Sequence, residues 1–131
     1  MIEISNKENY QKAISSNLYD YIVVAQEGSE FNDNFISEFT KIATEFAPDI
    51  IYSDYIKDHG NDHIQEKIRN KTIIFGELKS KPDFIKNAAI KTSVIKKYGI
   101  DIDTIVRPAH NLLLWHIPKF LFKLKEEYGE E

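Results

Sequence analysis

Residues 21–56, YIVVAQEGSEFNDNFISEFTKIATEFAPDIIYSDYI, carry the clearest secondary-structure pattern of this chain. Residues 21–25 form a continuous apolar run rich in β-branched side chains, which is typical of a central strand covered on both faces. From residue 35 to residue 46, apolar residues recur at steps of three and four, as in an amphipathic helix, until Pro48 prevents its continuation. Residues 50–56 again favour a strand. This order predicts a βαβ unit with parallel strands and a right-handed crossover.

The sequence on either side of this unit predicts smaller elements. Ser5, followed three residues later by Glu8, fits a capping box and predicts a first helix over about residues 6–16. A short strand is predicted over residues 72–75, and irregular or extended chain is predicted over residues 82–90.

The last part of the chain predicts two further helices. Thr92 is suited to cap a short helix that the glycine at residue 99 ends. Pro108 suits the first turn of an amphipathic helical tail at about residues 108–127, which Pro118 kinks or splits. Together the elements predict a single α/β domain over residues 1–131, with a small, mainly parallel sheet flanked by helices.

The composition excludes several classes of function. The chain has 131 residues, of which 17 are basic and 21 acidic, and its formal net charge is −4. This mild negative charge is spread along the sequence, whereas binding to a nucleic-acid backbone requires a clustered basic surface. The absence of cysteine excludes disulfides, thiolate zinc sites and cysteine nucleophiles. No apolar run approaches the roughly 20 residues that span a bilayer, and the first residues do not resemble a signal peptide, so a soluble, cytoplasmic protein is expected.

Four segments of the chain carry a family resemblance through their order. They are YDYIVVAQEGSEF (residues 19–31), PDIIYSDYI (48–56), IKTSVIKKYGI (90–100) and HNLLLW (110–115). In this order they resemble the middle and rear of a glycosyltransferase family 2 domain, one of the inverting GT-A fold enzymes that use nucleotide sugars. The resemblance implies a truncated GT-A (Rossmann-like) domain and a nucleotide sugar or a glycan as the ligand. The nucleotide-binding front portion of such enzymes has no counterpart before Met1.

The family's functional motifs are changed in this sequence. The resemblance places the aspartates of the metal-binding Asp-x-Asp motif on Gln26 and Gly28, which leaves Glu27 as the carboxylate between them. An amide and a glycine do not replace two anionic oxygen ligands of Mn²⁺ or Mg²⁺. The family's Glu-Asp pair, which includes the general base, falls on His110 and Asn111. Asparagine cannot accept the proton, whereas histidine can act as a base near neutral pH.

Three functional hypotheses follow from these changes. The first is a reduced, non-catalytic glycosyltransferase-like module that acts through binding, for example an accessory protein of a phage or mobile element in the host cytoplasm. The second is an active transferase that a partner chain completes and that uses Mn²⁺ or Mg²⁺. The third is an unrelated small α/β domain, although the sequence contains no Gly-rich phosphate-binding loop of a known type.

Most of the candidate site residues lie where the two strands of the βαβ unit end, because open α/β sheets bind ligands at the carboxyl ends of their strands. His110 and Asn111 are instead expected at the start of the last predicted helix, where exposed amides can contact an anion or a hydroxyl group. For a bound substrate the candidates are Gln26, Glu27, Gly28, Ser29, Asp54 and Asn111. Glu27 and Asp54 are also the candidate metal ligands, and His110 is the candidate catalytic base. The alternative for residues 26–29 is an ordinary turn in which glycine supplies a positive φ, and for Asp54 it is a turn acceptor at the end of a strand.

Further charged and apolar groups allow additional hypotheses. Asp58, His59, Asp62 and His63 include possible metal ligands, but the Gly-Asn pair between the histidines favours a solvated loop. Asp101 and Asp103 repeat an Asp-x-Asp pattern and favour a structural turn. The apolar residues of the tail, residues 120–124, favour an interface with a second copy of the chain or with another protein.

Overall fold

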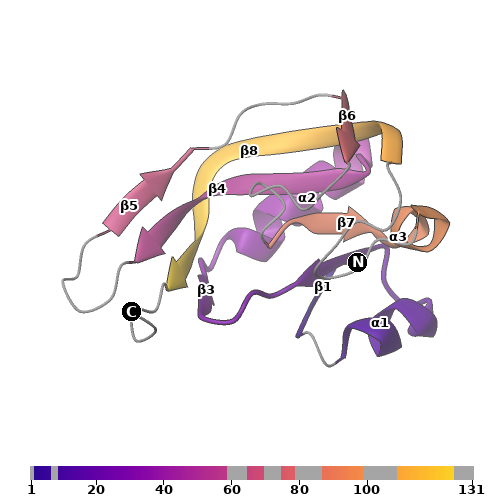
Figure 1. Cartoon of the computed structure of the whole chain (residues 1–131), viewed down its shortest axis with the longest axis horizontal. Coiled ribbons are helices and arrows are strands. Elements are labelled where there is room, and N and C mark those ends of the chain that lie inside the picture. Colours follow the sequence, from indigo (N-terminus) through magenta and orange to yellow (C-terminus); the bar gives the residue numbers. More distant parts are fainter. Residues whose placement is uncertain are drawn as a thin grey trace.

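A mixed, curled sheet runs through the molecule, and helices pack on both of its faces (Figure 1). The computed structural model describes residues 2–6, 9–58, 65–69, 75–78, 87–98 and 109–125. Within these residues the helices are α1 (Tyr10–Ser16), α2 (Phe35–Phe46) and α3 (Thr92–Tyr98). The strands are β1 (Ile2–Ser5), β2 (Tyr21–Val24), β3 (Ser29–Phe31), β4 (Ile50–Asp58), β5 (Gln65–Ile68), β6 (Phe75–Leu78), β7 (Ala89–Lys91) and β8 (Ala109–Lys125). No helix in the described part of the chain is long and apolar enough to cross a membrane.

Helix α2 confirms the helix predicted from the apolar spacing. Phe35 and Phe39, one helical turn apart, are buried against the sheet, and their rings stack with centroids 4.2 Å apart. The helix ends at Ala47, which adopts a left-handed conformation (φ 43°) and donates its backbone N–H to the carbonyl oxygen of Ala43. Pro48 follows and cannot continue the helix. Helix α2 therefore covers one face of the sheet through Phe35 and Phe39.

The second face of the sheet is covered by α1 and α3. Alternate residues of a strand point to opposite faces, so Val23 packs towards α2 while Ile22 packs with α1 and α3. On this second face, Ile22 shares a buried cluster with Tyr10 and Ile14 of α1 and Ile95 of α3. Strand β2 is therefore buried on both sides, as its apolar run predicts.

The prediction of a mainly parallel sheet was wrong. The strand order is β1-β2-β7-β4-β8-β3, with β5 added to β4 and β6 added to β8. Strands β2 and β4 are parallel to each other, but β7 lies between them and is antiparallel to both. Ala89 of β7 pairs with Val23 on one side and Ile51 on the other. This strand has three residues, too few to show an alternating pattern, and it begins at the end of the segment that was predicted as irregular or extended chain.

The predicted helical tail is instead the long strand β8. It runs parallel to β4, and the two strands lie side by side across one edge of the molecule (Figure 1). Its register with β4 jumps from Ile117 to Phe120, so Pro118 lies in a bulge, where a residue without an N–H does not interrupt the ladder. The error has a physical reason: Leu114 and Ile117 lie on opposite faces of the strand before the bulge, yet both are buried, and with Leu121 they give steps of three and four that mimic a helix.

The same strand bears on the predicted self-association. Leu121 and Phe122, two of the apolar residues on which that prediction depends, are buried in this chain's own core. Phe120 lies beneath the charged groups of Lys67 and Arg69, whose Nζ and Cζ atoms are 5.8 and 5.5 Å from its ring centroid. An interface with a second copy or another protein stays a prediction.

The start of the chain differs from the predicted first helix. Ser5 closes strand β1, which pairs in parallel with β2, and its hydroxyl donates to the Asn6 carbonyl oxygen rather than capping a helix. Helix α1 begins at Tyr10, after the side chain of Asn6 has accepted a hydrogen bond from the Asn9 backbone. The end of the helix at Ser16 agrees with the sequence pattern. The helix predicted from Thr92 is also confirmed as α3, and the Thr92 hydroxyl donates to the Tyr19 carbonyl oxygen (2.7 Å).

Candidate functional site

The turn that follows β2, residues 26–29, is held by a buried asparagine. The backbone N–H of Gln26 donates to Oδ1 of Asn87 (2.8 Å), and Nδ2 of Asn87 donates to the Ser29 hydroxyl (2.8 Å). Asn87 is 1% exposed and lies just before β7. One amide side chain therefore bridges the two ends of the turn. Asn87 was not among the candidate residues, because no local pattern in the sequence marks a partner 61 residues away.

Gly28 is required at this turn for a structural reason. Its φ is +85°, a conformation that side chains with a Cβ rarely adopt. Its carbonyl oxygen accepts a hydrogen bond from the Lys125 backbone N–H (3.0 Å), and a Cβ placed here would lie 3.2 Å from the Lys125 carbonyl oxygen. The close approach that glycine allows is therefore to β8. The neighbouring Glu27 side chain is exposed.

Asp54 was expected at the end of its strand, beside Glu27, but it does not lie there. Strand β4 continues to Asp58, and β7 separates β4 from β2. Asp54 is 4% exposed, and its Oδ1 is 2.7 Å from Nε2 of His116 in β8. This pair lies on the face of the sheet opposite α2, because Ile51 and Tyr55, which alternate with it along β4, pack towards α2.

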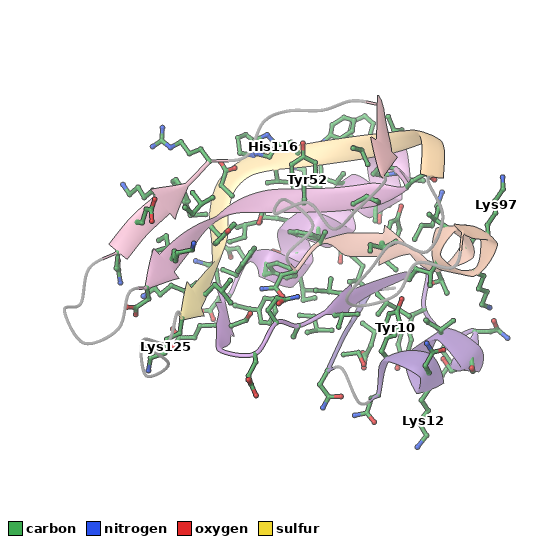
Figure 2. The ribbon with its side chains drawn as sticks, in the orientation of Figure 1. Tyr10, Lys12, Tyr52, Lys97, His116 and Lys125 are labelled. Atoms are coloured by element: carbon green, nitrogen blue, oxygen red, sulfur yellow. The ribbon has the colours of Figure 1, made fainter. Side chains whose placement is uncertain are left out.

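The aromatic ring of Tyr52 completes this buried group. It stacks on the imidazole of His116, with ring centroids 5.0 Å apart and planes inclined by 11°. Figure 2 shows Tyr52 and His116 next to each other where β4 and β8 run side by side. His116 was not among the candidate residues, since only the register of β8 on β4 brings it to Asp54, 62 residues away. Asp54 thus contributes a carboxylate to an internal contact.

The other candidate residues do not form a metal centre in the part of the chain that the structure describes. No group of three His, Asp or Glu side chains suited to a metal ion occurs among those residues. Asp58 pairs with Gln65 in the sheet, while His59, Asp62, His63, Asp101 and Asp103 lie outside the described residues. His110 and Asn111 belong to strand β8 rather than to a helix start, and their side chains are also outside the description.

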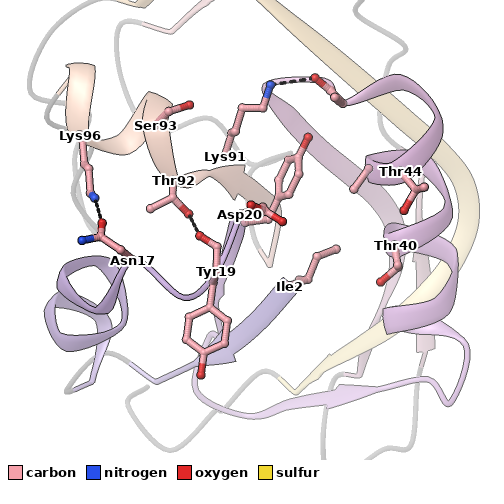
Figure 3. A pocket seen from close by; sticks show the side chains of 13 residues that line it. Ile2, Asn17, Tyr19, Asp20, Thr40, Thr44, Lys91, Thr92, Ser93 and Lys96 are labelled. Carbon is pink, nitrogen blue, oxygen red and sulfur yellow. Dashed lines mark hydrogen bonds between the residues drawn. The ribbon is translucent and has the colours of Figure 1, made fainter.

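A cleft of about 510 Å³ lies at the opposite end of β2 from this turn (Figure 3). One wall is the side of α2 that carries Thr40 and Thr44, and the other is formed where β7 passes into α3 at Thr92 and Ser93. The start of β2 contributes Asp20 and Tyr21. No motif in the sequence indicates this cleft, because its lining comes from the ends of several elements.

Two lysines of this cleft are held by neutral oxygen atoms. Nζ of Lys91 donates to the carbonyl oxygen of Ala47 at the end of α2 (3.0 Å). Nζ of Lys96 donates to the side-chain oxygen of Asn17. Figure 3 shows Lys91 and Lys96 on the β7–α3 side of the cleft, with Asp20 between them and α2. Neither acceptor carries a charge that would neutralise the ammonium group.

Tyr21 forms the inner surface of the same cleft. Its hydroxyl donates to the Pro48 carbonyl oxygen (2.5 Å), and the residue is 3% exposed. Burial raises the pKa of this hydroxyl to about 12, and the nearby carboxylates of Asp49 and Asp20 add to the increase. The neutral phenol is therefore the form that the folded chain favours.

Tyr21 makes the stability of the fold sensitive to alkaline pH. Its pKa is about 12 in the folded chain and 10.0 in the unfolded chain, so its contribution is complete below pH 10 and is lost as pH rises towards 12. The loss is expected to reach about 2 to 3 kcal/mol in the free energy of unfolding. Urea denaturation of the wild type and of Tyr21→Phe, from pH 8 to pH 12, measures it.

The Phe variant is the control for all other groups that titrate over this range. It loses the hydrogen bond to Pro48 and is expected to be less stable at pH 8 by about 1 kcal/mol, with a smaller decline at higher pH. Equal declines in the two proteins would contradict the assignment.

No model of a known protein family matches this chain, and no curated protein matches it either.

Proposed function

We propose that this chain is a non-catalytic, glycosyltransferase-like module that recognises a carbohydrate without transferring a sugar. The observation that carries the proposal is the use of candidate substrate-binding and metal-binding positions for internal contacts. The turn of residues 26–29 is tied to Asn87 and to Lys125, and Asp54 is paired with His116. These groups serve the fold, although the resemblance places the metal-binding aspartates in this turn and Asp54 is the second candidate metal ligand.

The chemistry of sugar transfer explains why these contacts matter. A metal ion that holds a nucleotide diphosphate requires hard anionic oxygen ligands, and the acceptor hydroxyl requires a base within hydrogen-bond distance. Gln26 and Gly28 supply no carboxylate, and the Asp54 carboxylate is buried against an imidazole. Glu27 contributes an exposed carboxylate to the turn. These side chains are better suited to binding a ligand than to catalysing sugar transfer.

The arrangement of the four resembling segments also supports the proposal. Segments 19–31, 48–56, 90–100 and 110–115 contain β2 and β3, most of β4, the end of β7 with α3, and part of β8. These strands are neighbours in the order β2-β7-β4-β8-β3, so the four segments share one sheet, as the resemblance requires. An unrelated α/β domain is the alternative.

The proposal is tested by measuring turnover and binding together. The purified chain is incubated with UDP-sugars and GDP-sugars in the presence of Mn²⁺, and release of the free nucleotide is measured. We expect none above the protein-free blank. Release that depends on Mn²⁺ and disappears in Glu27→Ala would overturn the non-catalytic assignment and favour the active transferase.

Binding is measured with the same preparation by thermal unfolding in the presence of a panel of neutral and acidic sugars. A sugar at 100 times its dissociation constant is expected to stabilise the fold by about 2.7 kcal/mol and to raise the midpoint by several degrees. Fluorescence of the single tryptophan, Trp115, reports the transition. The absence of a shift with every sugar, in a chain that unfolds cooperatively, would contradict carbohydrate recognition.

A further inference from the structure

The cleft between α2 and the β7–α3 junction has a charge opposite to that of the whole chain. Its lining contains two cationic side chains, Lys91 and Lys96, and one anionic side chain, Asp20. The chain as a whole has a formal net charge of −4. A local excess of positive charge in a recess of a negatively charged molecule favours a compact anion.

The lysines retain donors for such an anion. An ammonium group has three N–H donors. Within the described part of the chain, Lys91 uses one donor on Ala47 and Lys96 uses one on Asn17, and both acceptors are uncharged. Each ammonium can therefore bind a phosphate or carboxylate oxygen while it keeps its present partner. A hydrogen bond between charged partners is stronger than a neutral one, so an anionic ligand gains affinity from these two groups.

The remaining lining is suited to a ring that carries hydroxyl groups. Thr40 and Thr44 present hydroxyls from successive turns of α2, and Ser93 presents one from α3 on the other side (Figure 3). Hydroxyls both donate and accept hydrogen bonds, as the hydroxyls of a sugar do. The volume of about 510 Å³ is within the range of small-molecule sites.

We infer that this cleft binds a small acidic sugar, a sugar ring bearing one phosphate or carboxylate group, with Lys91 and Lys96 on the anion and the α2 hydroxyls on the ring. The inference rests on the proposed function for the class of ligand, and it adds the site and the acidic group. It places the ligand at the amino-terminal end of β2, away from the turn of residues 26–29.

The test is a titration with four probes, glucose 6-phosphate, glucuronate, glucose and inorganic phosphate, followed by thermal unfolding and by calorimetry. Both acidic sugars are expected to bind at least tenfold more tightly than glucose and than phosphate alone. Lys96→Met is expected to weaken the binding of both acidic sugars at least tenfold. Lys97→Met, on the same helix but outside the cleft lining, serves as the matched control and is expected to leave binding unchanged.

Two further variants separate binding from folding. Lys91→Met removes the cation that contacts the end of α2, so Lys91→Arg, which keeps the charge, is measured beside it and is expected to restore most of the affinity. Thr44→Val removes a hydroxyl from the cleft wall and is expected to weaken the acidic sugars while leaving inorganic phosphate unchanged.

The outcomes distinguish this inference from the proposed function. Equal affinity for glucose and for the acidic sugars, or for phosphate and for glucose 6-phosphate, would overturn the acidic-sugar assignment. Binding that survives in both Lys96→Met and Lys91→Met would overturn the site but leave carbohydrate recognition intact. Turnover of a nucleotide sugar would overturn the non-catalytic function and leave the cleft assignment standing.

Discussion

Phe39→Ala is expected to lower the free energy of unfolding by about 3 to 5 kcal/mol, because it removes a fully buried ring from the centre of the core. Phe39 is 0% exposed and stacks on Phe35, so its removal leaves a cavity between α2 and the sheet. Urea denaturation followed by far-ultraviolet circular dichroism measures the loss. Since a small domain has a total stability of about 5 to 15 kcal/mol, this change alone can unfold a large share of the molecules.

Phe46→Ala provides the matched control on the same helix. Phe46 is 46% exposed and stacks on Trp115 with ring centroids 4.2 Å apart. Its truncation is expected to cost about 1 kcal/mol, since much of the ring is already in contact with water. Equal losses in the two variants would show that α2 does not pack through the Phe35–Phe39 side.

Asp54→Ala is expected to cost about 2 to 4 kcal/mol, since it leaves the imidazole of His116 buried without this carboxylate. Both side chains are nearly inaccessible, at 6% and 7% exposure. Asp54→Asn keeps the shape and can still hydrogen bond to the ring, so a smaller loss is expected. The measurement is again the midpoint and slope of urea unfolding.

The alternative role of Asp54 predicts a different result. A carboxylate kept as a metal ligand adds little stability in the absence of the metal, and its removal then leaves the unfolding midpoint unchanged or higher. Asp33→Ala, at an exposed position before α2, is the control and is expected to change stability by less than about 0.5 kcal/mol. An Asp54→Ala protein as stable as this control would refute the structural role.

The elements that could be predicted from sequence are those with a local signal. Helix α2 has three turns of regular apolar spacing and a proline that ends it, and α3 has a threonine at its start. Strand β8 shows where this reasoning fails. Its first part is buried on both faces, so its buried residues do not follow the alternation of a half-buried strand, and only the pairing with β4 distinguishes it from a helix.

The candidate site was harder to predict because its contacts depend on strand order. Glu27 and Asp54 were expected at one edge of the sheet on the assumption that β2 and β4 are adjacent. That assumption is wrong, because β7 lies between the two strands. Asn87 and His116 reach their partners across the sheet, from 61 and 62 residues away in sequence. No local pattern encodes such pairings, since they follow from the register of strands that meet only in the folded chain.

Selective broadening of backbone amide signals by Mn²⁺ tests the central claim most directly. In a ¹⁵N-labelled sample titrated with Mn²⁺, with and without UDP or GDP, a metal bound between Glu27 and Asp54 would broaden the amides of residues 26–29 and of Asp54 before all others. The account predicts no selective loss at these residues under either condition. Loss confined to these amides, and dependent on the nucleotide, would contradict it and restore a metal-dependent sugar-nucleotide site.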